Sequence, residues 1–334
     1  MSRSVQLAIG LLISVACLWL AMHDVRPAEV WAALSQANYI GFAVLIVLTL
    51  LGFWIRAFRW RWLLADSTAV TNGQLYSATM IGFMANNLLP LRLGEFVRAW
   101  ALGRSANLSK TTVFATVVVE RVVDMITLIV IFGIAMWVKP IGESTAAGRL
   151  VRRGATAMVL GAAALTVFAV FLERQPRRMQ TLLGWLTRPL PQRLGRRVVA
   201  MLGHFIDGLA LFRDIPRLLW VFLLSFLMFG VFALCLTACL WAFQIPSAWY
   251  AGLVMLVITA IGIMVPAAPG YIGTLHVACK VGLALFHVGP ELSVPFAWFF
   301  WAGQWLPVTL VGLIYLRREG LSLRSLGRAE EEPA

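Results

Sequence analysis

The chain has 334 residues, of which 60% are apolar and only 13% are charged, against about 25% charged in an ordinary soluble domain. Apolar runs of the roughly 20 residues that a bilayer requires recur along the whole chain. This composition excludes a soluble enzyme and a soluble binding domain. The formal net charge of +13 does not indicate nucleic-acid binding, because the arginines cluster between apolar runs, as membrane topology requires.

The apolar runs predict an all-α polytopic membrane protein, a single transmembrane domain over residues 1–334 with about six full transmembrane helices plus two broken hairpins. The six expected spans are Ser4–Met22, Tyr39–Trp62, Thr111–Val138, Gly154–Leu172, Leu218–Phe243 and Pro295–Leu316. The first run has a long apolar core, and no small-residue cleavage site precedes His23. We therefore expect a retained anchor rather than a cleaved signal peptide.

Two further apolar stretches are interrupted in their middle and predict re-entrant hairpins near residues 73–104 and 249–288. The first is broken by the segment Asn86 to Gly94, and the second by the segment Pro266 to Gly273. The flanks of each break are about 10 to 15 residues long, which is short for a full span. Proline removes an amide donor, so both breaks should hold non-helical backbone at membrane depth. Such backbone survives only inside protein or beside a water-filled cavity, so each break predicts a cavity.

The distribution of arginines predicts that both termini are cytoplasmic. The cytoplasmic side then receives Arg56, Arg59 and Arg61, the Glu173–Arg217 segment with nine arginines, and the short tail 317–334. On this topology the first hairpin enters from the cytoplasm and the second from outside, which is the pattern of an inverted repeat with a site at the midplane. Two interpretations of residues 173–217 remain open: an amphipathic helix that lies on an anionic membrane leaflet, or a basic loop.

Charged residues at membrane depth are costly and mark candidate functional positions. One group is Arg92, Glu95 and Arg98, which share a face if the segment from Gly94 is helical. The other group lies within the third span and comprises Glu120, Arg121 and Asp124. These six residues carry three positive and three negative charges, so one interpretation is mutual pairing that pins the hairpin to the third span. The other leaves an arginine facing a cavity, where its planar fork suits a phosphate.

The two breaks supply the remaining candidate residues. Asn86 and Asn87 offer amide donors beside the first break, and Arg92 within it is the expected main contact to an anionic headgroup, with Arg98 second. In the second break, Pro269, Gly270 and Gly273 shape a tight turn, and His276 follows it. His276 is interpreted either as a proton carrier or as a histidine hydrogen-bonded in a helix interface.

Three motifs in sequence carry a resemblance: Asn86–Arg98, Glu120–Asp124 and Pro266–Gly273. Over roughly residues 5–318, their order and spacing resemble the transmembrane domain of lysylphosphatidylglycerol synthases, a family that includes stand-alone flippase-like membrane proteins. The resemblance implies a domain that moves a lipid across the bilayer, whereas a separate soluble domain attaches lysine to the lipid. The tail after the last span is short, so the resemblance implies a stand-alone member. One departure is His276, where family members often have a glutamate.

These observations predict a lipid translocase of the bacterial cytoplasmic membrane that moves an anionic phospholipid or a polyprenyl-phosphate-linked lipid. We expect no catalytic residue, metal or cofactor, and Cys17, Cys235, Cys239 and Cys279 are expected to be buried small apolar side chains. The oligomeric state stays open, a homodimer included. Two alternatives remain. One is an intramembrane enzyme in which Glu120 and Asp124 hold a metal and Arg92 a phosphate, and the other is a scaffold subunit.

Overall fold

The computed structural model describes residues 3–64, 70–89, 93–138, 214–265, 268–323 and 326, together with positions 149, 152–154, 156–157, 159–160 and 163–164. Within these residues every regular element is a helix, as the apolar runs predicted. The expected fourth span, the Arg92 position and residues 173–213 of the basic segment lie wholly or largely outside the described part.

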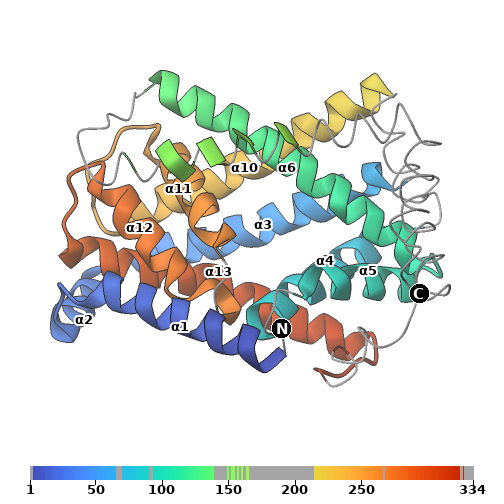
Figure 1. The fold of residues 1–334 in the computed structure, drawn as a ribbon, viewed down its shortest axis with the longest axis horizontal. Helices are drawn as coiled ribbons and strands as arrows, with labels where there is room; N and C mark the ends of the chain where they lie inside the picture. The colour runs from blue at the N-terminus through green and yellow to red at the C-terminus, as the bar shows by residue number, and fades with distance from the viewer. Residues whose placement is uncertain are drawn as a thin grey trace.

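Six helices run along the length of the molecule or cap one end of it (Figure 1). They are α1 (Arg3–Met22), α2 (Pro27–Gln36), α3 (Tyr39–Leu63), α6 (Lys110–Val138), α10 (Ile215–Ala242) and α13 (Pro290–Arg318). Among the described residues α3, α10 and α13 are each long and apolar enough to cross a membrane. Helix α6 has 29 residues but carries three charges in its middle. The second, third, fifth and sixth predicted spans therefore each correspond to one continuous helix.

A sharp bend follows the first helix. The α1 segment Gly10–Met22 and α2 meet at 75°, and Pro27 begins α2, where its missing amide hydrogen is not needed. Lys280 holds this bend to a later part of the chain. Its Nζ atom donates to the carbonyl oxygen atoms of Leu20 and Ala21 at 3.0 and 3.2 Å and pairs with Asp24 at 2.8 Å. A cation at a helix C-terminus is favourable, so Lys280 anchors the end of α1.

The first interrupted stretch forms a helical hairpin of α4 (Asn72–Leu88) and α5 (Gly94–Ser105), two helices packed closely against each other. At the open end, the Gln74 side chain donates to the carbonyl oxygen of Ser105 at 2.7 Å. At the turn, Oδ1 of Asn86 accepts a hydrogen bond from the Gly94 amide at 2.8 Å. A β-carbon at Gly94 would collide with the carbonyl oxygen of Gly82, so the close approach of the two arms requires glycine there.

The second interrupted stretch is also a hairpin, formed by α11 (Ala251–Met264), the short 3₁₀ helix η4 (Pro269–Tyr271) and α12 (Thr274–Ala284). Its turn depends on two glycines in the left-handed region, Gly270 with φ 72° and Gly273 with φ 91°. The turn rests on α1, because the Ala268 amide donates to the Ser14 hydroxyl at 2.7 Å. The breaks predicted from proline and glycine are therefore present in both hairpins.

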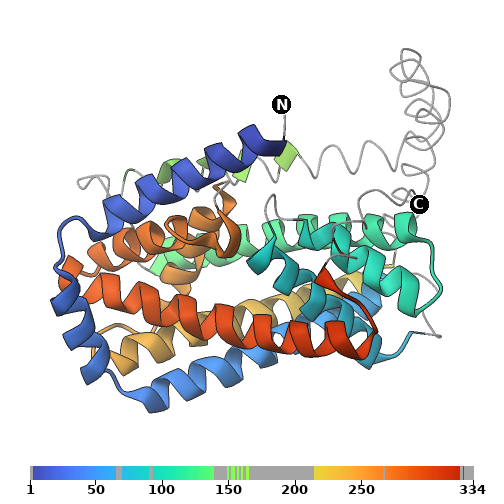
Figure 2. The ribbon, with the colours of Figure 1, turned by 90° about the horizontal axis from the view of Figure 1, so that it is seen from below.

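The two hairpins occupy opposite halves of the molecule, and their turns meet in the middle (Figures 1 and 2). Trp305 of α13 lies between them: its indole Nε1 atom lies 3.4 Å from the carbonyl oxygen of Asn87, and a β-carbon on Gly270 would lie 2.9 Å from that same nitrogen. Trp301, one turn earlier, donates to the Gly270 carbonyl oxygen at 2.8 Å. Opposed hairpins are the arrangement that the arginine distribution indicated. Their depth in a membrane and the inverted repeat stay predictions.

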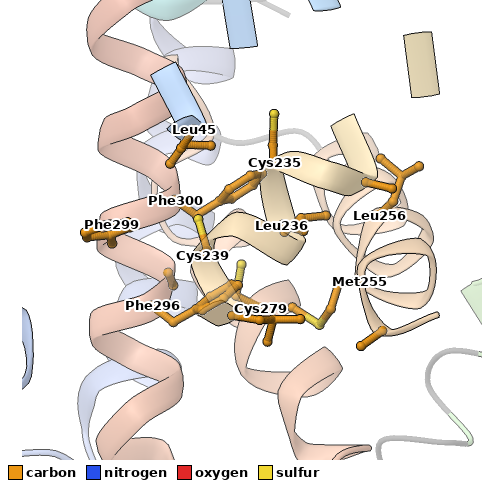
Figure 3. Packing of buried hydrophobic residues seen from close by; sticks show 14 of the residues in the cluster. Leu45, Cys235, Leu236, Cys239, Met255, Leu256, Cys279, Phe296, Phe299 and Phe300 are labelled. Carbon is orange, nitrogen blue, oxygen red and sulfur yellow. The ribbon is translucent and has the colours of Figure 1, made fainter. Parts of the chain in front are cut away.

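The apolar core of the half that holds the second hairpin contains three of the four cysteines (Figure 3). Cys235 and Cys239 of α10 and Cys279 of α12 are buried against α13 residues such as Phe296 and Phe300. All four cysteines are free thiols. These three therefore serve as small core side chains, as predicted, whereas Cys17 of α1 is only partly buried and the prediction is wrong for it.

Candidate functional site

Three helices bring charged side chains into one buried cluster, here called the arginine cluster. Its members are Arg56 and Arg59 of α3, Arg98 of α5, and Glu120, Arg121 and Asp124 of α6, with the hydroxyl of Ser225 from α10 beside them. Helical spacing explains the convergence. The two α3 arginines are three residues apart and the two α6 carboxylates four apart, so each pair projects from one helix face.

Glu120 is the centre of the cluster and is fully buried. Its Oε2 atom accepts from Nη1 of Arg98 at 2.8 Å. Its Oε1 atom accepts from Arg56 at 2.9 Å and from Arg121 at 2.8 Å, and Nη2 of Arg59 lies 3.2 Å away. One carboxylate therefore contacts four guanidinium groups, and its removal would leave those charges uncompensated.

Asp124 forms the second half of the cluster, one turn along α6. Its Oδ1 atom accepts from Nη1 of Arg59 at 2.6 Å, and the same nitrogen donates to the Ser225 hydroxyl at 2.6 Å. Its Oδ2 atom lies 3.2 Å from Arg56 and 3.1 Å from Arg121. Asp124 thus ties α3 to α6, and Ser225 joins α10 to the same network.

Arg98 links the first hairpin to this network. Its guanidinium carbon lies 3.7 Å from the centroid of the Trp60 ring, and the Trp60 indole donates to Thr116 at 2.9 Å. A guanidinium over an indole face is a favourable cation–π arrangement. The mutual-pairing interpretation left the partners open between Arg92 or Arg98 and Glu120 or Asp124, and the structure contains the pair of Arg98 with Glu120, which joins the hairpin to α6.

Arg56 and Arg59 are the members that the sequence analysis missed. We assigned both to the cytoplasmic flank of the second span and not to the cluster, whereas their side chains are only 8% and 0% exposed. The side of the membrane on which they lie stays a prediction. Their spacing of three residues was the available signal. It places both arginines on one helix face, where they could meet the two acidic residues of the third span.

The predicted residues around the first break have different positions. Arg92 lies outside the described residues. Glu95 is partly buried, and its Oε2 atom lies 3.5 Å from Nδ2 of Asn86. The Asn87 amide donates to the Thr309 hydroxyl at 3.0 Å. Both asparagine side chains therefore make contacts within the protein that hold the first hairpin, and their contact with a ligand stays a prediction.

The residues of the second break are not brought to the arginine cluster by any contact among the described residues. Pro269, Gly270 and Gly273 shape the turn that meets Asn87 and α1. His276 is 1% exposed and packs edge-on against Trp298, with ring centroids 4.3 Å apart. Within the described part of the chain neither of its ring nitrogen atoms has a hydrogen-bond partner. The hydrogen-bonded histidine that we considered is therefore not observed, and a proton-carrier role stays a prediction.

Two open apolar grooves are present in the described part of the structure. One, of about 410 Å³, is bounded by α2, α3 and α13, with Tyr39, Phe42 and Trp301 among its lining residues. The other, of about 420 Å³, is bounded by α10 and α11. Neither groove is lined by a residue of either break, so the cavity predicted at each break stays a prediction. Among the described residues, histidine, cysteine and acidic side chains form no group that could hold a metal ion.

Comparison with known proteins identifies a matching family and two relatives. The sequence profile of the lysylphosphatidylglycerol synthase transmembrane region matches residues 7–312. A UPF0104 membrane protein from Methanothermobacter thermautotrophicus is 30% identical over 142 residues, which cover 39% of this chain and 41% of that protein. Glycosyltransferase AglD from Haloferax volcanii is 29% identical over 136 residues, which cover 40% of this chain and 22% of that protein. The match thus spans less than half of either relative, and no solved structure matches.

Proposed function

Because the chain belongs to the lysylphosphatidylglycerol synthase transmembrane region family, we propose that it translocates an anionic phospholipid or a polyprenyl-phosphate-linked lipid across the membrane. In this proposal the headgroup passes through the protein while the lipid tails stay in the bilayer. The family and the apolar helices support a multi-pass membrane protein. The cytoplasmic membrane and the cytoplasmic termini remain part of the proposal.

The observation that carries this proposal is the excess of positive charge in the arginine cluster. Among the described residues, four guanidinium groups, three of them almost completely buried, pair with the two carboxylates of Glu120 and Asp124, and Glu95 interacts electrostatically with Arg121. A structural ion-pair network tends toward neutrality, because unpaired charge at membrane depth is costly. A cationic excess beside the first hairpin therefore favours a site that receives an anionic group.

The opposed hairpins supply the second element of the proposed mechanism. Their turns touch through Trp305, which contacts both Asn87 and Gly270. In this conformation the turns lie against each other, so passage of a headgroup requires them to separate. A transporter with opposed broken helices can do this by moving one hairpin against the other around a central site. Trp305 is then the contact that breaks in each transport cycle.

The ion pairs of Glu120 and Asp124 bear on the enzyme alternative. It placed a metal on Glu120 and Asp124, but in the structure every carboxylate oxygen of both residues lies within 3.2 Å of a guanidinium nitrogen. The relative named as a glycosyltransferase shares only 22% of its length with this chain. The structure therefore does not favour the enzyme reading. The scaffold reading remains as the alternative that the transfer assay tests.

The test is lipid transfer in proteoliposomes that contain no nucleotide. Fluorescent phosphatidylglycerol and a labelled polyprenyl phosphodiester are placed in both leaflets, and an impermeant quencher reports the fraction that becomes accessible. We expect the quenched fraction to exceed that of empty vesicles and of vesicles holding an unrelated polytopic helical protein. A matched variant, Trp305→Phe, removes the indole donor at the hairpin contact and should change the transfer rate. Failure of both lipids to move faster than in the control vesicles would refute translocation.

A further inference from the structure

We propose that the arginine cluster binds one phosphate-type oxyanion with a single negative charge, held by the Nε–Nη2 edge of Arg98. This inference rests on the proposed function and deepens it by naming the class of headgroup. The class is a phosphodiester lipid whose headgroup carries no compensating cation. Arg92, which the sequence favoured as the main contact, is not required by this geometry.

One edge of the Arg98 guanidinium group carries two donor atoms without a hydrogen-bond partner in the described part of the chain. A guanidinium group has five N–H donors in one plane, and those on Nε and Nη2 share its side edge. In Arg98 the Nη1 atom is used by Glu120 at 2.8 Å, whereas Nε and Nη2 are buried without a hydrogen-bond partner in the described part of the chain. Two parallel N–H donors on one edge match two oxygen atoms of a phosphate. The Nε–Nη2 edge of Arg98, which has the geometry to bind an oxyanion, is therefore the edge that has no hydrogen-bond partner in the described part of the chain.

Trp60 and Glu120 hold the orientation of this edge in place. The Arg98 guanidinium lies over the Trp60 ring at 3.7 Å, and Trp60 is itself fully buried and bonded to Thr116. The ring fixes the plane of the guanidinium, and Glu120 fixes its rotation within that plane. A prepositioned donor pair loses little side-chain entropy when it binds, which favours recognition of a small rigid group.

The charges of the arginine cluster and of Glu95 do not cancel. Four guanidinium groups meet Glu120 and Asp124, and Glu95 interacts electrostatically with Arg121. These seven groups leave one positive charge in excess in the described part of the chain. A single monoanion neutralises it, a dianion overcompensates it, and a headgroup that brings its own ammonium leaves the excess in place. The single excess positive charge therefore favours a phosphodiester lipid whose headgroup carries no positive charge.

The other three arginines of the cluster also have donor atoms that make no hydrogen bond in the described part of the chain. The Nε atoms of Arg56, Arg59 and Arg121 and the Nη2 atom of Arg59 are buried without a hydrogen-bond partner among the described residues. The Arg59 edge differs from that of Arg98 because its Nη2 atom lies 3.2 Å from Oε1 of Glu120. An unpaired buried donor is unfavourable. Arg121 differs from the rest because its side chain is 38% exposed. An anion that approaches from outside the bundle therefore meets Arg121 first and Arg98 at the buried end.

The test is a titration of the full-length protein in detergent after lipid removal, followed by native mass spectrometry. The probes are short-chain phosphatidylglycerol, the matched phosphatidylcholine and inorganic phosphate. Wild type should bind one phosphatidylglycerol, and Arg98→Lys, which keeps the charge but loses the two-donor edge, should bind it at least about tenfold more weakly. The matched control Arg104→Lys changes an exposed arginine on the same helix and should leave binding unchanged.

Each probe has an outcome that overturns one part of the proposal. Equal affinity of wild type and Arg98→Lys for phosphatidylglycerol overturns the assignment of the edge. Equal affinity for phosphatidylcholine overturns the monoanion class, and inorganic phosphate that binds as tightly as the lipid overturns the lipid as the source. If Arg98→Lys does not fold, the double variant Arg98→Gln with Glu120→Gln removes the edge and keeps the excess charge unchanged, and it should show the same loss.

Parallel transfer assays separate this inference from the proposed function. Transfer by wild type together with unaltered lipid binding by Arg98→Lys refutes the Arg98 site and leaves translocation standing. Lipid binding that depends on Arg98, with no transfer by wild type, refutes translocation and leaves the oxyanion site standing.

Discussion

The guanidinium group of Arg98 lies over the face of Trp60, 3.7 Å from the ring centroid, while its Nη1 atom binds Glu120 at 2.8 Å. The stacking and the ion pair come from different helices, α3 and α6. One side chain of the first hairpin is therefore held from two directions. Through these two contacts Arg98 holds the first hairpin against both α3 and α6.

Substitution of Trp60 tests the stacking. Trp60→Phe keeps an aromatic face under Arg98 but loses the hydrogen bond to Thr116, and should lower the free energy of unfolding by about 1 kcal/mol. Trp60→Leu loses the face as well as ring volume, and should cost about 3 kcal/mol or more. Chemical unfolding in detergent gives both values. Equal costs for the two variants would show that the aromatic face contributes nothing.

Asp124→Asn tests whether the cluster is a coupled ion network. The change leaves Arg59 and Arg56 with one carboxylate fewer in a buried site, which should cost about 3–5 kcal/mol of stability. The double variant with Arg59→Gln removes both members of the pair and should recover part of that loss. The control Glu291→Gln alters an exposed acidic residue and should stay within about 1 kcal/mol. An Asp124 variant that unfolds like wild type contradicts the network.

Gly273→Ala tests the turn of the second hairpin. Gly273 has φ 91°, and a β-carbon there would collide with the carbonyl oxygen of Ser14. Gly320 also has a positive φ, 65°, but its β-carbon position is open, so Gly320→Ala isolates backbone strain, roughly 1 kcal/mol. We expect Gly273→Ala to cost clearly more in thermal unfolding and to loosen α1, read out as faster labelling of Cys17. If both variants lower the unfolding temperature equally, the contact between Gly273 and α1 does not contribute to stability.

The link between Asp24 and Lys280 should depend on pH. Lys280 donates to Asp24 and lowers the pKa of that exposed carboxyl below its ordinary value. A lowered folded-state pKa gives stability that is present above the ordinary pKa of about 4 and is lost as the pH falls through the lowered value. The melting temperatures of wild type and Asp24→Asn should therefore differ at neutral pH and converge in acid. A difference that persists unchanged in acid contradicts the assignment.

Single cysteines test the membrane topology in a Cys17→Ser background. Asn107 lies in the loop between α5 and α6, and Ser247 in the loop between α10 and α11, at opposite ends of the molecule (Figure 1). Both residues are exposed. An impermeant thiol reagent should label Ser247→Cys from outside intact cells and Asn107→Cys only after the membrane is opened. Labelling of both from the same side would refute the opposed hairpins as a membrane arrangement.

The sequence by itself determined the class of protein and most of its long helices. Apolar runs such as Tyr39–Trp62 and Leu218–Phe243 became α3 and α10 with ends shifted by only a few residues. The two helix breaks could also be predicted from the sequence, because proline and glycine change the conformation of the backbone at their own positions. Hydrophobic length and backbone chemistry are local properties, and a single sequence displays them.

Only the tertiary structure decided which charges meet. Arg56 and Arg59 stand beside Arg61 at the end of a span, where a flanking role is the ordinary expectation. The packing of α3 against α10 and α6 instead buries both, 65 residues or so from Asp124 along the chain. Pairing of charges depends on helix rotation and neighbour choice, and these follow from side-chain packing over the whole bundle. For the same reason the unpartnered edge of Arg98, on which the proposed ligand class rests, was visible only once Trp60 and Glu120 were placed around it.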